Sequence, residues 1–288
     1  MIAGENKGRR LGVLALVVAL GAALSSCMFS PGKFASELDI RKAGTFRFSY
    51  TGEIHVLALS KLAASMQGGV GDGTFAPQPC FAAGSSSSER KCSAAELAEQ
   101  KRVWQEAQNA GAARRGRDAE SMKAMFGGID PADPRAAEDL AVRLRRQAGW
   151  RKVVHRGDGL FEVEFAIEGR LDHDFSFPTI ERFPATNPFV QVMLRADNTV
   201  RIDAPAFAPA AAGEPYRGWM QAAALGDGRQ RAPQLPEMEG SFTVKTDAAV
   251  LANNTDTGPA SDAAGQRLDW RVSQRSAAAP MALLRLQR

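Results

Sequence analysis

The first 27 residues constrain this chain more than any other segment, because they have the three parts of a secretory signal. A basic stretch with Lys7, Arg9 and Arg10 precedes residues 11–24, which are all apolar or small. This run is shorter than the roughly 20 apolar residues that an α-helix needs to span a bilayer. The pattern therefore predicts a cleaved signal peptide at residues 1–26. No later stretch reaches the length of a membrane span, so we expect no further transmembrane helix.

The apolar run ends in Leu24-Ser25-Ser26-Cys27, which resembles the lipobox of bacterial lipoproteins. The resemblance implies that the sulfur of Cys27 receives a diacylglyceryl group. It also implies that a dedicated peptidase cuts before this cysteine and that the new amine is acylated. One acyl chain binds a membrane marginally, at about 0.8 kcal/mol per buried methylene, whereas two or three chains give stable attachment. The alternative is an ordinary secretory signal with an incidental cysteine.

The residue after the cysteine bears on the membrane in which the protein resides. In enterobacterial lipoproteins an Asp at this position retains the protein in the inner membrane, and here the residue is Met28. The resemblance therefore implies a lipid anchor in the outer membrane of a bacterial envelope, with the body facing the periplasm. The 36 basic and 32 acidic side chains give a net charge of +4. This excess is too small and too scattered to indicate nucleic acid as a partner.

The chain has three cysteines, too few for a scaffold held together by disulfides. Lipidation of Cys27 would leave Cys80 and Cys92, and an exported pair can form a disulfide. The enclosed segment is rich in Gly and Ser, so closing this loop would restrict the unfolded chain by about 3 kcal/mol. The alternatives are two free thiols or a metal site, and a metal site needs more ligands than lie nearby in the sequence.

The order of patterns predicts an α+β fold with a mainly antiparallel sheet and two or three helices inserted after the first strands. Residues 27–42 are expected to form a lipidated tether. Residues 43–236 would form the α+β body, with a helical insert at about 93–148. Residues 237–288 would add a C-terminal β section to the same domain. The clean alternation of Thr45–Thr51 is typical of a half-buried strand.

Three helices are indicated within the insert. Ser93 and Glu96 form a capping box for a helix that runs to about Gly111. A short helix is expected at 118–126, before two glycines, and a third would have Asp133 as its N-cap. One apolar stripe of this third helix is spaced to pack on a sheet, and it comprises Ala137, Leu140, Ala141, Leu144 and Ala148.

Strand patterns return after the helices. Two runs flank Gly157-Asp158-Gly159, and two more flank Ala196-Asp197-Asn198. Each short interruption predicts a hairpin. A further alternating strand is expected at Leu171–Phe177.

A catalytic site is less clearly indicated. Asp172, His173 and Asp174 are consecutive in the last of these strands, and such side chains can bind a metal or transfer a proton. A periplasmic hydrolase that uses them is the alternative function, whereas exposed polar positions on a strand are the simpler explanation. No H-E-x-x-H or P-loop pattern is present. We therefore expect no metal and no cofactor, and favour a protein that is not an enzyme.

A basic cluster is the strongest candidate for a binding surface. It spans the end of the third predicted helix and the following strand, where cations are favourable at a helix C-terminus. The same side chains could instead contact anionic lipid headgroups. The candidates are Arg143, Arg145, Arg146, Arg151, Lys152 and Arg156.

Two further stretches resemble envelope lipoproteins. Cys27–Phe34 and the strand pattern of Leu38–Tyr50 are similar to those of uncharacterised proteobacterial lipoproteins. Gly240–Val272, which contains Leu268-Asp269-Trp270, resembles LppM-type lipoproteins, whose β-rich domains are linked to envelope glycolipids. These resemblances imply a non-enzymatic role in binding or scaffolding an envelope lipid or protein, and they supply no catalytic residue.

Overall fold

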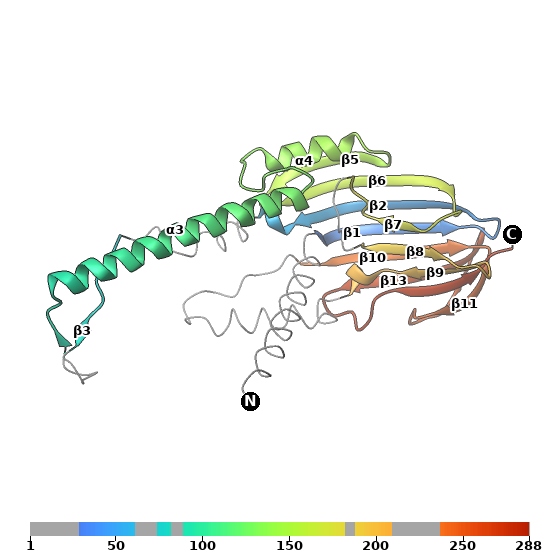
Figure 1. Cartoon of the computed structure of the whole chain (residues 1–288). Helices are drawn as coiled ribbons and strands as arrows, with labels where there is room; N and C mark the ends of the chain where they lie inside the picture. The colour runs from blue at the N-terminus through green and yellow to red at the C-terminus, as the bar shows by residue number, and fades with distance from the viewer. Residues whose placement is uncertain (1–28, 61–73, 82–88, 182–187, 209–236, 288) are drawn as a thin grey trace, which may run out of the picture.

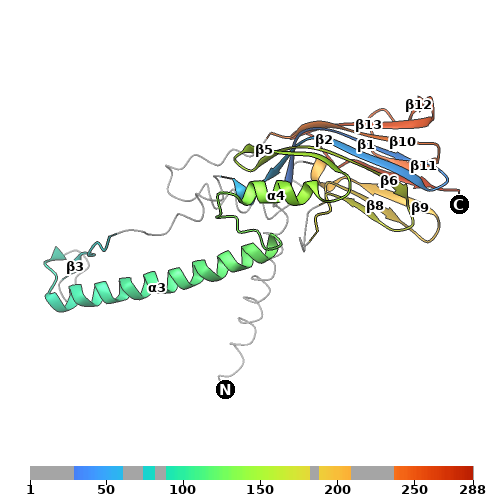
Figure 2. The same cartoon turned by 90° about the horizontal axis from the view of Figure 1, so that it is seen from above.

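The computed structural model describes residues 29–60, 74–81, 89–181, 188–208 and 237–287 (Figure 1). The predicted signal peptide and Cys27 lie outside these residues. Within the described ranges, no helix has a stretch long and apolar enough to cross a membrane. All described strands except β3 and β4 form two β-sheet layers, and a long helix projects from one end of them (Figures 1 and 2).

The larger sheet has seven strands, and β1 (Phe29–Ile40) lies in its interior. Neighbouring strands are antiparallel except for β1 and β10, which are parallel. The C-terminal section therefore shares a sheet with the first strand. The order across the sheet is β12 (Ala260–Asp262), β13 (Gly265–Ser273), β10 (Glu239–Thr246), β1, β2 (Thr45–Val56), β6 (Leu160–Arg170) and β5 (Trp150–Gly157).

The smaller sheet packs against the larger one through aromatic side chains. Phe177 has its ring centroid 5.1 Å from that of Phe48 and 5.0 Å from that of Tyr50, both on β2. Phe34 of β1 also stacks on Phe207 of the short helix η3 (Pro205–Phe207), and their ring centroids are 4.3 Å apart. The smaller sheet has the order β11 (Ala249–Asn253), β14 (Met281–Arg285), β9 (Thr199–Asp203), β8 (Val190–Leu194) and β7 (Phe175–Phe177).

Residues 29–40, which we expected to form a tether, are instead strand β1. Ser36, Leu38 and Ile40 alternate toward the interior and are all buried, which is the period of a strand with one face on the core. The pairing of β1 with β2 shifts between Pro31 and Phe34. This bulge accommodates a proline, which cannot donate a hydrogen bond to a neighbouring strand.

The prediction of an α+β fold with a mainly antiparallel sheet is confirmed, but the helix count differs. The first two predicted helices are one helix, α3 (Ala94–Met125), whose predicted capping box of Ser93 and Glu96 is present. Gly111 and Gly116 each cost the helix about 1 kcal/mol relative to Ala. They do not interrupt it, because the residues between them are Ala and Arg, which favour helices. At 1.5 Å per residue α3 is about 48 Å long.

The third predicted helix is α4 (Ala136–Arg145), and its N-cap is Arg135 rather than Asp133. The Asp133 carboxylate accepts a hydrogen bond from the Arg135 backbone N–H at 2.8 Å, so it closes a turn before the helix. The predicted apolar stripe of α4 is buried except for Ala148, which lies beyond the helix end. This stripe packs on the larger sheet beside the smaller sheet (Figure 2).

Both predicted hairpins are present, with Asp158 and Asn198 in the left-handed region at their turns. The strand predicted at Leu171–Phe177 is too long, because β7 begins at Phe175 and residues 171–174 form a turn. The strand predicted at Thr45–Thr51 continues through Gly52 to Val56 in β2, and residues 57–59 form the short helix η2. Gly52 permits this because its φ is +145° and a Cβ there would lie 2.2 Å from the Lys33 carbonyl oxygen.

Replacing Phe177 with Ala should destabilise the body by about 3–5 kcal/mol, because the ring joins both sheets and its loss leaves a cavity. The free energy of unfolding, from urea denaturation, checks this. Val103→Ala is the control, since this side chain of α3 is 51% exposed and should change stability by less than about 0.5 kcal/mol. Equal effects of the two changes would contradict a core centred on Phe177.

Candidate functional site

The first strand begins beneath α4. Phe29 and Leu144 of α4 line the same apolar crevice, so the beginning of β1 lies next to this helix. The free volume there is about 10 Å³, which is less than a single water molecule needs. This part of the body therefore has no room for an acyl chain. The remaining lining residues are Ile54, Val56, Trp150, Phe161, Val163, Pro178 and Ile180.

A polar cleft of about 620 Å³ lies between α4 and the end of α3. Ala136, Asp139, Arg143 and Arg146 of α4 are spaced by three or four residues and so share one helix face. The opposite face of α4 carries the buried apolar stripe. The amphipathic pattern of this helix thus positions the cleft. Lys123, Gly128, Ile129, Asp130, Asp133 and Val142 complete the lining.

The cleft contains three cationic and three anionic side chains, and some of them have structural roles. Arg143 donates a hydrogen bond to the Gly127 carbonyl at 2.7 Å and so holds the turn after α3. Asp130 accepts a hydrogen bond from the Ala132 backbone N–H at 2.9 Å. Asp133 closes the turn before α4.

The remaining three charged side chains of the cleft are Lys123, Asp139 and Arg146. Their side chains form no hydrogen bond or ion pair with any residue that the structure describes. The cleft therefore combines charges of both signs that have no protein partner within the described ranges.

The six predicted anion-contact residues do not form one free patch. Arg145 donates to the Val153 carbonyl at 2.8 Å and pairs with Glu138 at 2.6 Å. Lys152 and Arg156 both pair with Glu162. These hydrogen bonds, first that from Lys152, lower the pKa of the Glu162 carboxyl below its ordinary value. Three of the predicted cations are therefore neutralised on the surface.

The other three predicted cations divide between the cleft and the solvent. Arg143 and Arg146 line the cleft. Arg151 is exposed and pairs with no described residue. Contact of these residues with an anion remains a prediction. Lys123, Asp130 and Asp139 were not predicted from the sequence. Lys123 and Asp130 join the cleft only because α3 and α4 meet there. For Asp139, the one available signal was its spacing with Arg143 and Arg146, which puts the three residues on one face of the helix.

Asp172 and His173 lie in the turn between β6 and β7 rather than on a strand. His173 Nδ1 contacts the Asp172 carboxylate, and these side chains are 83% and 74% exposed. Asp174 accepts a hydrogen bond from the Leu194 backbone N–H at 2.9 Å, so it anchors the turn to β8. No group of three or more potential metal ligands occurs within the described ranges. The structure thus places the three residues on an open turn.

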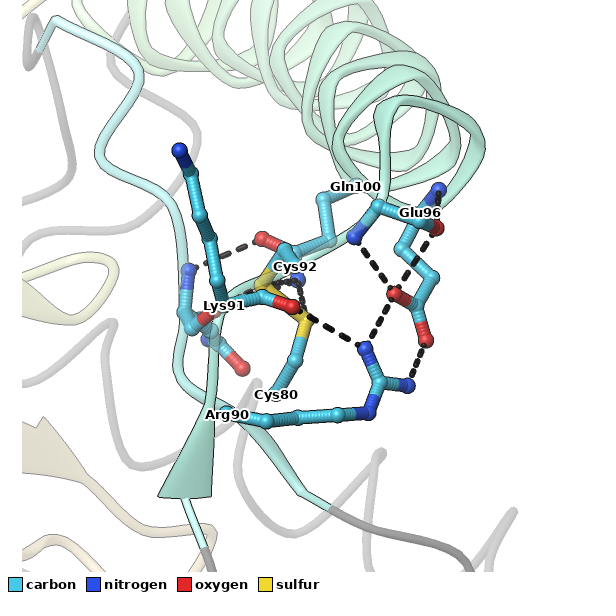
Figure 3. Close-up of polar contacts among 8 residues, drawn as sticks. Cys80, Arg90, Lys91, Cys92, Glu96 and Gln100 are labelled. Carbon is cyan, nitrogen blue, oxygen red and sulfur yellow. Dashed lines mark hydrogen bonds and ion pairs between the residues drawn. A yellow bond between two sulfur atoms is a disulfide. The ribbon is translucent and has the colours of Figure 1, made fainter.

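The far end of α3 is tied to a two-stranded hairpin, β3 (Cys80–Phe81) and β4 (Glu89–Arg90). The predicted disulfide between Cys80 and Cys92 is present, with an S–S distance of 2.05 Å. Figure 3 shows Arg90 reaching from the hairpin to Glu96, with which it forms hydrogen bonds of 2.5 and 2.9 Å. Gln100 exchanges two hydrogen bonds with the backbone of Gln78. The disulfide and these contacts fix the hairpin on the first turns of α3.

No family model matches this sequence, and no curated protein matches it significantly in sequence. Among solved structures, the folded domain of LppM from Mycobacterium tuberculosis aligns over 90% of this chain and 93% of its own length. The sequence identity is 11% and the TM-score is 0.30. A TM-score this low does not establish a common fold.

The tip of α3 should loosen in acid. Hydrogen bonds from Arg90, and then from Ser93, lower the pKa of Glu96 from 4.5 to about 2. A carboxyl whose pKa is lower in the folded state stabilises it fully above the unfolded pKa, and the contribution is lost as the pH falls. As the pH falls from 4.5 to 2, the amide protons of residues 93–96 should therefore lose their protection from hydrogen exchange, which NMR measures.

Glu96→Gln should remove most of this pH dependence. Glu120→Gln is the matched control on the same helix, because Glu120 is exposed and pairs with no described residue. If both variants kept the full transition in this pH window, the pairing of Glu96 with Arg90 would not be its cause.

Proposed function

We propose that this chain is a lipid-anchored protein of the bacterial outer membrane that faces the periplasm and binds or scaffolds another envelope component without catalysis. The observation that carries the proposal is the lipobox-like sequence of residues 24–27, which lies just ahead of the paired strand β1. Removal of residues 1–26 would leave every described strand intact. The Cys80–Cys92 disulfide supports export, because such bonds persist in oxidising compartments.

The short distance between the anchor and the sheet sets the position of the body. An extended residue spans at most about 3.6 Å, so Cys27 lies within about 7 Å of Phe29. The acyl chains would hold the end of the body that contains α4 directly at the bilayer, without a tether. This geometry suits a protein whose binding surface must act at the membrane.

The arm formed by α3 is the element best suited to reach a protein partner. This helix is about 48 Å long and projects from one end of the sheets (Figures 1 and 2), and Val103 is an exposed apolar side chain on it. A helix that is polar on most of its faces is typical of one that bridges solvent between bodies. The alternative, a hydrolase based on Asp172, His173 and Asp174, has only an exposed turn to support it.

Replacement of Cys27 by Ser should abolish incorporation of radiolabelled palmitate and release the protein from the membrane fraction. The acyl chains supply most of the binding free energy, so their loss should outweigh any other contact. The Cys80→Ser/Cys92→Ser double variant is the control and should keep the label. Label that persists in the Cys27 variant, or that never appears on the unaltered chain, would contradict the proposed anchor.

A photo-crosslinking amino acid at Val103 should give a discrete adduct with one envelope protein in intact cells. The same amino acid at Leu251 is the control, because Leu251 is 41% exposed but lies on β11 in the body. Irradiation followed by mass spectrometry identifies the adducts. Similar diffuse products at both positions would show that α3 has no specific partner.

A further inference from the structure

We propose that the cleft between α3 and α4 binds a ligand in which a phosphate and a primary ammonium lie close together, the chemistry of a phosphatidylethanolamine headgroup. The inference rests on the proposed function, because anchoring at Cys27 would place the cleft beside the bilayer. It adds a ligand class and a site that the anchoring itself does not require.

The mixture of charges in the cleft selects for a zwitterion. Lys123, Arg143 and Arg146 line it together with Asp130, Asp133 and Asp139. A ligand with only negative charge would be repelled by the carboxylates, and a simple cation would be repelled by the arginines. A phosphate can accept paired hydrogen bonds from a guanidinium, while an ammonium can donate to a carboxylate. One zwitterionic ligand satisfies both sets.

Some charged side chains of the cleft have no ion-pair partner among the described residues, unlike those on the neighbouring surface. On β5, Lys152 and Arg156 are neutralised by Glu162. In the cleft, Lys123, Asp139 and Arg146 pair with no residue that the structure describes. The unpaired side chains come from two different helices and face one hollow. A ligand can therefore bind them without breaking an existing ion pair.

The position and size of the cleft fit a headgroup rather than a whole lipid. One face of α4 meets Phe29 through Leu144, and the opposite face lines the cleft. A helix with its side chains is about 10 Å across, which puts the cleft within roughly 20 Å of Cys27. Its volume of about 620 Å³ is in the usual range for small-molecule sites. The apolar crevice under α4 has no room for an acyl chain, so the chains would stay in the bilayer.

The test uses the full-length lipidated protein, purified in a neutral detergent, and isothermal titration calorimetry with three probes. Dihexanoyl phosphatidylethanolamine should bind saturably, and dihexanoyl phosphatidylglycerol, which lacks the ammonium, should bind at least about tenfold more weakly. Free phosphoethanolamine distinguishes the source. If phosphoethanolamine binds more weakly than the lipid, the site is assigned to a membrane headgroup. If it binds equally or more tightly, the result supports a soluble ligand of the same chemistry. Equal affinity for both lipids, or no binding of any probe, would overturn the proposal.

Two substitutions assign the binding to this cleft. Arg146→Ala should weaken phosphatidylethanolamine binding about tenfold, whereas Arg271→Ala removes the same charge from β13, outside the cleft, and should leave it unchanged. Asp139→Asn should abolish the preference for phosphatidylethanolamine over phosphatidylglycerol, with Glu120→Gln as its control. These side chains are exposed, and circular dichroism confirms that each variant folds. Equal effects of Arg146→Ala and Arg271→Ala would overturn the site.

The two proposals can fail separately. Palmitate on Cys27 without selective binding of phosphatidylethanolamine would leave the anchor standing and remove the headgroup site. Selective binding by a chain that carries no palmitate would support the cleft chemistry and remove the anchored function.

Discussion

The described structure depends on aromatic packing between two sheets. Phe177, on the short strand β7, lies within 6 Å of the rings of Phe48, Tyr50, Trp150, Phe165 and Phe189. Such rings bury large apolar surfaces and prefer offset or tilted contacts. Because they fill the interior, the body is a packed sandwich rather than a container. The polar cleft lies at the surface, where α3, α4 and the turn between them meet.

Much of the architecture could be predicted from local patterns, and the errors have identifiable causes. The capping box at Ser93, both hairpin turns and the apolar stripe of α4 depend on neighbours in the sequence, so a single chain reveals them. The sequence did not reveal that the two predicted helices would merge into α3. This depended on how strongly Gly111 and Gly116 would disturb the helix-favouring residues between them. The identity of β1 was hidden because its parallel partner β10 lies far along the chain, with Lys33 opposite Glu239.

The candidate site likewise combines residues that local sequence could reveal with residues that only the fold brings together. Arg143 and Arg146 were identified from a local concentration of positive charge. Lys123 and Asp130 could not be recognised with them, because only the tertiary meeting of α3 and α4 brings these residues to one hollow. Pairing across a sheet likewise removed Lys152 from the set of free cations, since Glu162 faces it from the neighbouring strand. Charge counted along a sequence does not show which groups are already neutralised.

The parallel pairing of β1 with β10 has a consequence for biogenesis. Lys33 aligns with Glu239, so if the chain is exported as proposed, its first strand must wait for the C-terminal section before the larger sheet is complete. Such high contact order slows folding, and an unpaired strand edge is prone to aggregate. The polypeptide would thus reach the far side of the membrane with an incomplete sheet beside its own lipid attachment point. Periplasmic chaperones that shield exposed strand edges would be most needed during this interval.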